Sequence, residues 1–548
     1  MWEKDIWCFK IILILIISIS VFYSNKAACT QNLFEREGEC SFPDISAKDL
    51  FSCDTKSSLM EEGMTSYGKG DYEAALYTFK KVTEMNPEYY YGWIAIGNSF
   101  LNLGNFQEAV EAFGKATDVN PKKFEGWNNK GILLLRLRRY PEAIEAFSHA
   151  IKIRHDSHEV CYNIGLVFLE IGKIHDAITA FDKALKFKPD FIDALDLKGL
   201  TLAQMRQFEE ALKVYERAVE LMPLNDELLY RKGLMLLRLN QHEKAISVFD
   251  HVLKLNPGHY VALIDKGMSL DDIGKGKEAI EAFNAALKIK PDFVEGWNVK
   301  GLSLTQQGRY SEAINAFDKA LELNPIAYLV WSNKGLCQIL IKEYESAIVS
   351  LEKSIQISPD FFPAWTNKAL ALNGLQRYDA ALDALDRAIA LQPDYIKAWI
   401  NRGEVLAQLK RYDEAVKAFD AAIKINPNVS EAWYNKGLSQ YFLEKYDDAV
   451  KSFDNALILR PEHYEILNIK GIALCKLHRY DEAIEAYEIA LMIKSDYFDV
   501  LYNMACTYVF LGNREKVSSI LSNLIQQNTS YKEKLARDPF FKDYNISQ

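Results

Sequence analysis

The sequence lacks the short motifs that mark common catalytic sites. It has no GxxxxGK[ST] phosphate loop, and the segment 274–277 (GKGK) falls in a turn inside a repeat. His242-Glu243 is followed by Ile246, where a zinc protease needs its second histidine. No CxxC pair is present, so neither a zinc ribbon nor a dithiol redox pair is indicated. We therefore predict a chain that is not an enzyme and that holds no cofactor and no metal.

Three histidines near one another could in principle bind a metal ion. His149, His155 and His158 lie close together, and the His155-x-x-His158 spacing could ligate a metal ion. No carboxylate or cysteine completes a plausible ligand set, so we assign these residues to the surface of a helix–loop–helix region.

The chain also lacks an excess of basic residues. Lys and Arg number 65 against 75 Asp and Glu, which gives a net charge of −10, and the two signs are mixed along the chain. A nucleic-acid-binding protein normally shows a basic stripe that meets the phosphates. We therefore predict that nucleic acid is not a partner.

Cysteine is scarce, with eight in 548 residues. Those at 161, 337, 475 and 506 fall on apolar faces of expected helices and are interpreted as small core residues. Cys29, Cys40 and Cys53 precede the repeats. If that part of the chain is exported, two of them could pair and leave one free thiol.

Long hydrophobic runs are absent except near the start. Residues 11–22 (IILILIISISVF) carry no charge and follow Lys4 and Lys10, which predicts a signal peptide or an N-terminal membrane anchor over 1–28. Lys26 makes a poor cleavage site, so cleavage and tethering through 11–22 both stay open. We predict an exported or membrane-anchored protein, with the extracytoplasmic side favoured, and interpret residues 29–55 as a linker.

What the sequence does have is a repeat of 34 residues. Proline recurs in register at 87, 121, 189, 223, 257, 291, 325, 359, 393, 427 and 461. From Lys56 to Tyr531 fourteen units follow one another without insertion or deletion. Self-similarity at this period indicates a solenoid of stacked units rather than a single-core globule.

Each unit contains the pattern of two helices. We number the unit so that its glycine or alanine (Gly63, Gly97 and onward) is position 8. Positions 4, 8 and 11 form one apolar helical stripe, and positions 20, 24 and 27 form a second. Glycine near position 15 is expected to end the first helix in the left-handed conformation, and proline at 32 ends the second. Tryptophan at 4 and Phe or Tyr at 24 are expected to fill the core between the close contacts of position 8 and Ala at 20.

Trp at 4, Gly at 8, Ala at 20, Phe at 24, Ala at 27 and Pro at 32 resemble the tetratricopeptide repeat over residues 56–531. The resemblance implies an all-α, right-handed superhelical solenoid of about fourteen helix–turn–helix repeats. His155 and Ser495 replace the proline, and Leu351 and Leu385 replace the aromatic residue. The last unit, 498–531, is degenerate, as an end unit should be, and 532–548 are expected to form a C-terminal cap and tail.

A second face of the first helix remains for binding. Positions 2, 6, 9 and 13 share an arc opposite the packed stripe. The resemblance implies that this face lines an inner groove that binds extended peptides. Position 6 is asparagine, an uncharged donor and acceptor, in seven units. These predicted groove residues are Asn129, Asn163, Asn333, Asn367, Asn401, Asn435 and Asn503.

We therefore predict a non-catalytic scaffold whose partners are other proteins or peptides. Two alternatives stay open. The chain could position substrates for a separately encoded enzyme, or it could self-associate as an envelope or membrane assembly protein. The asparagines themselves have a simpler explanation, which is solubility of an exposed helix face.

Overall fold

The structure of this protein, a computed structural model, describes residues 55–527, 532–533, 535, 538–541 and 544. The predicted signal peptide or anchor over 1–28, the tether segment 11–22 and all of the linker except Thr55 lie outside these residues. Among the helices that are described, none combines the length and the apolar character that a membrane crossing requires.

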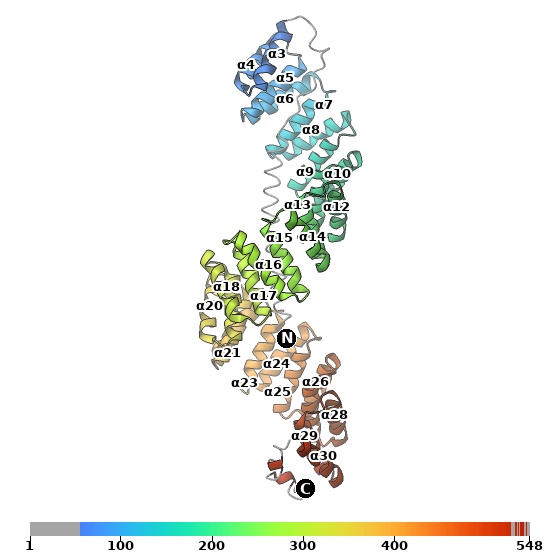
Figure 1. Cartoon of the computed structure of the whole chain (residues 1–548), viewed down its shortest axis with the longest axis vertical. Coiled ribbons are helices and arrows are strands. Elements are labelled where there is room, and N and C mark those ends of the chain that lie inside the picture. Colours follow the sequence, from blue (N-terminus) through green and yellow to red (C-terminus); the bar gives the residue numbers. More distant parts are fainter. Residues whose placement is uncertain (1–54, 528–531, 534, 536–537, 542–543, 545–548) are drawn as a thin grey trace. The chain divides into compact units, whose positions relative to one another are not determined.

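Twenty-eight α-helices, and no strand, make up the described repeats (Figure 1), which confirms the predicted all-α superhelical repeat fold. The first helices of the repeats are α3 (Thr55–Gly68), α5 (Tyr90–Asn102), α7 (Phe124–Arg136), α9 (His158–Glu170), α11 (Ile192–Gln204), α13 (Asp226–Arg238), α15 (Tyr260–Asp272), α17 (Val294–Gln306), α19 (Tyr328–Leu340), α21 (Phe362–Gly374), α23 (Ile396–Gln408), α25 (Ser430–Phe442), α27 (Tyr464–Lys476) and α29 (Phe498–Phe510).

The second helices begin after a short turn. They are α4 (Tyr72–Met85), α6 (Phe106–Val119), α8 (Tyr140–Ile153), α10 (Ile174–Phe187), α12 (Phe208–Leu221), α14 (His242–Leu255), α16 (Gly276–Ile289), α18 (Tyr310–Leu323), α20 (Tyr344–Ile357), α22 (Tyr378–Leu391), α24 (Tyr412–Ile425), α26 (Tyr446–Leu459), α28 (Tyr480–Ile493) and α30 (Arg514–Gln527). A 3₁₀ turn, η1 (Pro539–Phe541), follows.

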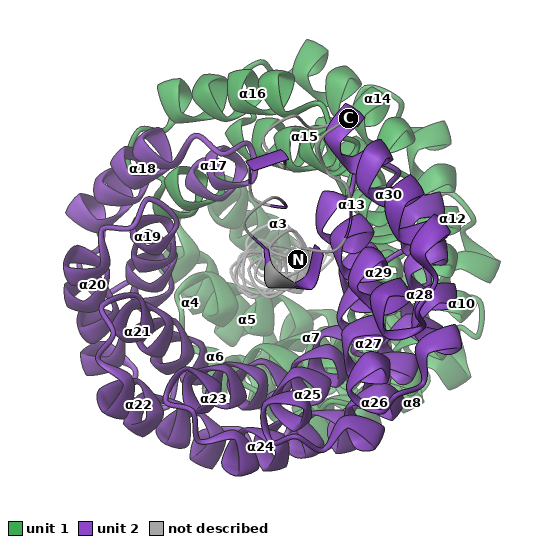
Figure 2. Ribbon diagram, turned by 90° about the horizontal axis from the view of Figure 1, so that it is seen from below, with its two compact units in different colours: residues 1–299 green, residues 300–548 purple. Residues whose placement is uncertain are grey.

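The chain divides into two compact units, residues 1–299 and residues 300–548, with the boundary inside α17. In each unit the helices curve into a stack (Figure 2). Consecutive odd-numbered helices contact one another, for example α7 with α9 in the first unit and α19 with α21 in the second, whereas the even-numbered helices stand further apart. The odd-numbered helices are therefore the inner helices of each stack, and the even-numbered helices are the outer ones.

In eleven of the fourteen repeats an aromatic ring packs against a glycine of the same hairpin. The side chain at position 24 lies on the position-8 residue of the same repeat, and a Cβ added at Gly403 would lie 2.5 Å from the ring of Phe419. Phe419 itself is buried, as predicted. Where position 24 is the smaller Leu385, position 8 is Ala369. Every repeat with a ring at 24 has glycine at 8, because a ring and a side chain cannot share the space, whereas a leucine at 24 occurs with alanine (Ala369) or with glycine (Leu351 with Gly335).

The turn between the helices has one conformation throughout the array. Position 15 has a positive φ in every repeat, including the predicted Gly104, Gly172, Gly274 and Gly308. Eight repeats place another residue there, such as Lys410 with φ 59°. Because a Cβ disfavours this conformation, the packing of the helices outweighs a local cost of roughly 1 kcal/mol at each of those eight turns.

The tryptophans at position 4 do not fill the core as expected. All seven are only partly buried. The indole Nε1 of Trp399 donates a hydrogen bond of 2.9 Å to the carbonyl oxygen of Pro393, and the same bond recurs in each of the other six. Tryptophan thus fastens the turn before its own helix, because only this side chain combines a large ring with an N–H donor.

The described residues of the tail pack against α29. Leu535 and Phe541 are fully buried, and Tyr502 Oη donates a 2.6 Å hydrogen bond to the Asp538 carboxylate. Phe540 meets the ring of Phe510 edge-on at 5.5 Å. These contacts cover apolar surface that the last inner helix would otherwise expose to water.

Candidate binding face

All seven asparagines predicted for the groove lie on inner helices. Asn129 and Asn163 belong to the first unit, on α7 and α9. Asn333, Asn367, Asn401 and Asn435 follow one another on α19, α21, α23 and α25 of the second unit, and Asn503 is on α29. Five are buried, and only Asn435 and Asn503 are partly exposed. The amides therefore lie deeper than a surface row, at the floor of the inner face rather than on its rim.

We call the four consecutive residues Asn333, Asn367, Asn401 and Asn435 the amide row. Their helices contact one another in sequence, so the four amides follow one line along the second unit. Asn401 is 7% exposed, and its Nδ2 has no hydrogen-bond partner among the described residues. A buried donor left unmatched costs about 1–3 kcal/mol, and because this nitrogen has almost no exposed surface, an incoming acceptor reaches it only if the side chain turns.

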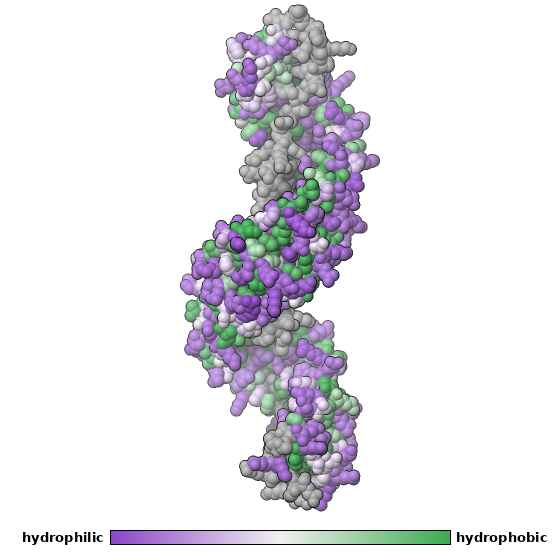
Figure 3. Space-filling model, in the orientation of Figure 1, coloured by the Kyte–Doolittle hydropathy of each residue, from purple (hydrophilic) through white to green (hydrophobic). Residues whose placement is uncertain are grey.

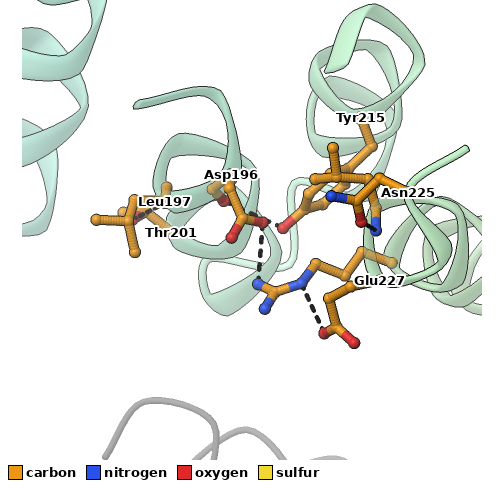
Figure 4. A network of polar contacts seen from close by, with 8 residues as sticks. Asp196, Leu197, Thr201, Tyr215, Asn225 and Glu227 are labelled. Atoms are coloured by element: carbon orange, nitrogen blue, oxygen red, sulfur yellow. Dashed lines mark hydrogen bonds and ion pairs between the residues drawn. The ribbon is translucent and has the colours of Figure 1, made fainter. Parts of the chain in front are cut away.

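In the first unit, position 6 is no longer asparagine after Asn163. Leu197, Arg231 and Asp265 take the place of asparagine on α11, α13 and α15. Arg231 Nη1 lies 3.0 Å from Asp196 Oδ1, and its Nε donates to Glu227 Oε1 at 3.1 Å (Figure 4). Burial raises the pKa of Asp196 to about 6, although the guanidinium of Arg231 opposes the shift.

The next inner helix continues this pattern. Asp265, also buried, accepts a 2.8 Å hydrogen bond from Tyr230 Oη. Burial raises the pKa of Asp265 to about 6, while the hydrogen bond from Tyr230 and the charge of Arg238 oppose the rise. We call Asp196, Glu227, Arg231 and Asp265 the charged block. Sequence reasoning missed it because it followed the asparagines at position 6 and not the repeats that lack one.

The second unit has one charged residue of a similar kind. Glu404 stands at position 9 of α23, where the neighbouring repeats have Leu370 and Leu438. Its Oε1 accepts a 3.1 Å hydrogen bond from the Asn435 amide of the amide row. Burial, reinforced by the charge of Glu431, raises the pKa of Glu404 to about 7, against the effect of the Asn435 bond. This residue was also not predicted, although the repeats on both sides of it have leucine at position 9.

Most of the basic residues at position 7 form ion pairs. Where position 25 of the preceding repeat is an acid, the two side chains pair, as Lys334 Nζ does with Asp318 Oδ1 at 2.6 Å; before Lys130 and Lys300 that position is Gly114 and Asn284. The same pairing joins Lys198, Lys232, Lys266, Lys368, Arg402, Lys436 and Lys470 to their neighbours. Pairs of this exposure contribute little individually, roughly 0–1 kcal/mol each.

The histidines and cysteines of the repeats have structural surroundings. His149 stacks on Trp127 with ring centroids 4.2 Å apart, and His158 meets Phe191 edge-on. Within the described part of the chain, no three His, Cys, Asp or Glu side chains are grouped as metal ligands. Cys161 and Cys337 are buried, and Cys475 and Cys506 are partly buried. Cys29, Cys40 and Cys53 lie outside the described residues.

Hydrophilic side chains prevail on the face drawn in Figure 3, where the hydrophobic ones are interspersed among them. A stack of helical hairpins with a row of amides on its inner helices defines an α-solenoid. Comparison with known families gives its identity. Tetratricopeptide repeat models match residues 94–158, 260–293, 294–325, 328–361, 366–430 and 434–497, which together exceed half of the chain. The chain belongs to the tetratricopeptide repeat family.

A further family model, the N-terminal tetratricopeptide region of psidin, matches residues 166–265. No curated protein sequence matches the chain. Among solved structures, a chain of the APC/C hetero-tetramer Cut9–Hcn1 is 17% identical, with 90% of this chain and 97% of that one covered and a TM-score of 0.36. Yeast Tom70 is 15% identical, with 84% and 100% covered and a TM-score of 0.38. YrrB, described as a tetratricopeptide protein with an unusual peptide-binding site, is 25% identical, with 35% and 98% covered and a TM-score of 0.29.

Proposed function

We propose that this chain is a non-catalytic scaffold that binds extended protein segments along the inner face of its second unit. The fold is one typical of protein–protein interaction. The observation that carries the finer proposal is the amide row, four asparagines at one repeat position on four consecutive inner helices. Its members lie on helices that contact one another, and the Nδ2 of Asn401 is unmatched.

The chemistry of the row fits a main chain better than a charged side chain. An amide offers two donor hydrogens and an acceptor oxygen and carries no net charge. An extended segment presents N–H and C=O groups at regular intervals whatever its sequence. A row of amides can therefore hold the backbone of such a segment, and affinity then accumulates from several modest bonds of about 0.5–1.5 kcal/mol each.

The test replaces the row as a whole. The variant Asn333→Ala, Asn367→Ala, Asn401→Ala and Asn435→Ala is compared with the wild-type chain by cross-linking in cells and mass spectrometry of the captured proteins. The control variant carries Asn315→Ala and Asn455→Ala on the outer helices α18 and α26. Loss of several bonds is expected to reduce capture by at least about tenfold in the row variant alone. Equal capture by all three chains would overturn the proposal.

Two further measurements separate the alternatives. A chain that positions substrates for another enzyme would co-purify with a catalytic activity, and a self-associating assembly protein would show a mass that rises with concentration in light scattering. Export, or tethering through residues 11–22, remains our proposal on the sequence alone. Protease accessibility of the repeats in intact cells, with and without disruption of the membrane, would test it.

A further inference from the structure

Glu404 has surroundings that are unusual for a carboxyl group inside a repeat. It is partly exposed on the inner side of α23, between two members of the amide row. Asn401, one turn earlier on α23, shares its helix face. Asn435, on α25, donates its Nδ2 hydrogen to Glu404 Oε1 at 3.1 Å. The carboxyl is thus surrounded by amides that also serve the proposed peptide-binding face.

No cation balances this carboxyl. Arg402, the basic residue nearest to it on α23, donates to Asp386 at 2.8 Å, and Lys436 on α25 pairs with Asp420 at 2.7 Å. Among the described residues, no Lys, Arg or His forms an ion pair with Glu404. The charged group that acts on it is Glu431 of α25, which has the same sign. A carboxylate here therefore lacks the counter-charge that a semi-buried ion normally requires.

The repeat itself shows that structure does not require an acid at this position. Leu370 and Leu438 occupy position 9 on the inner helices to either side of α23. A leucine at 404 would satisfy the packing of the repeat without a desolvation cost. A group that costs stability on a face open to a ligand, and that has unmatched hydrogen-bonding capacity beside it, is a candidate for recognition.

We propose that Glu404 selects a positively charged side chain, lysine or arginine, in the segment that lies along the amide row. The inference rests on the proposed function, because it assumes that the row binds a main chain. The ammonium or guanidinium group would lie between α23 and α25, where it gains the carboxylate of Glu404. The amides would fix the backbone, and Glu404 would fix the register.

The proposal has a consequence for pH. Burial holds the pKa of Glu404 at about 7, so the free site is about half ionised at neutral pH. A bound cation favours the ionised form, and binding therefore releases a proton below that pKa. Affinity for a cationic segment is expected to rise between pH 6 and pH 8, whereas affinity for a neutral segment should not.

The test uses the full chain and a positional-scanning library of ten-residue peptides, acetylated and amidated at their ends and labelled for fluorescence anisotropy. Wild type is expected to prefer Lys and Arg over Gln and norleucine at one library position, by about tenfold at pH 8 and by less at pH 6. In Glu404→Gln and Glu404→Leu the ratio of the Lys and norleucine dissociation constants should fall to about one. The control Glu485→Gln removes an exposed carboxyl of outer helix α28 and should keep the preference.

The possible outcomes distinguish the role proposed for Glu404 from the peptide binding proposed for the amide row. Peptide binding that the four-asparagine variant abolishes, but that shows no preference for a cation, would overturn the role of Glu404 and leave the amide row standing. A cation preference that persists in both Glu404 variants would overturn it as well. No peptide binding by wild type, or binding that survives in the four-asparagine variant, would overturn both proposals.

Discussion

The inner helices α11, α13 and α15 of the first unit and α19, α21, α23 and α25 of the second belong to the same 34-residue repeat. They differ in the polar residues at position 6, which are charged in the first set and uncharged amides in the second. In the second unit position 6 is asparagine four times in succession, and position 4 is tryptophan in each of those repeats. In the first unit position 6 reads Leu197, Arg231 and Asp265, and position 4 is leucine on all three helices. The helices nonetheless begin and end at corresponding residues.

An asparagine and a charged residue at position 6 require different neighbouring residues. Asparagine needs no counter-charge, and three of the four repeats of the amide row have leucine at position 9, with Glu404 as the exception. Arg231 is accompanied by Asp196 from the preceding inner helix and by Glu227 from its own first turn. Asp265 is accompanied by Tyr230. Each buried charge of the charged block thus has an oppositely charged or hydrogen-bonding partner, whereas Glu404 of the second unit has only the amide of Asn435.

The strongest way to break the comparison is to remove the arginine. Arg231→Met leaves the partly buried carboxyl of Asp196 without its counter-charge, and we expect a loss of up to about 3 kcal/mol in the local stability of α13. Asn401→Leu is the matched change at position 6 of the second unit, where Leu197 shows that leucine fits. It should alter the stability of α23 by less than about 1 kcal/mol, since its amide has an unmatched Nδ2.

Native-state hydrogen exchange of the two helices measures both effects in separate repeats, which suits a chain whose repeats open locally. Adding Asp196→Asn to Arg231→Met should recover part of the loss, because the buried charge disappears together with its partner. Equal effects of the two single changes would mean that the charged block contributes no more than an ordinary position.

The pH dependence of stability is the second expected difference between the two units. The pKa of Asp265 is raised to about 6 from an ordinary value of 3.8, so its ionisation opposes folding. Well below pH 3.8 the group is protonated in both states and contributes nothing, and above about pH 6 the cost approaches its full value, about 3 kcal/mol for a two-unit shift. Asp265→Asn, which restores the amide of the other unit, should stabilise α15 by up to that amount at pH 8 and hardly at all at pH 4.

The reverse change provides the control. Asn367→Asp places a carboxyl on the buried floor of the second unit, and α21 should then lose stability as the pH rises from 4 to 8. Hydrogen exchange at the two pH values, corrected for the intrinsic rate of each amide, reports both variants. A stabilisation by Asp265→Asn that is equal at both pH values would contradict the assigned ionisation.

The repeat, its two helices and its turn could be predicted from sequence because each depends on residues close together in the chain. Gly104 and Pro393 mark turns by their own backbone preferences, and Phe419 is apolar at a helical spacing. The same local rules placed the seven asparagines on inner helices. Their burial could not be predicted, because it depends on how closely consecutive inner helices approach one another.

The charged block and Glu404 could not be derived from the repeat pattern because they are departures from it. An averaged unit hides a single Arg231 or Glu404, and only the structure shows that Asp196, one repeat away, faces the arginine. The tryptophans show the same limit in another way. Their spacing indicated burial, but the indole N–H bonds to a proline carbonyl six residues earlier, and this requires the ring to lie at the edge of the core.

The smallest expected difference between the units lies at that tryptophan. Trp399→Phe keeps a ring but removes the 2.9 Å bond to Pro393, and a lost hydrogen bond of this kind costs about 1 kcal/mol. Trp399→Leu copies Leu229 of the first unit and also removes the ring, so it should cost more, by the apolar contact of the lost ring. Denaturant-dependent hydrogen exchange of α23 separates the two terms. If Trp399→Phe proves as stable as wild type, the bond to proline adds nothing, and the leucine repeats of the first unit then lack only the contact area of a ring.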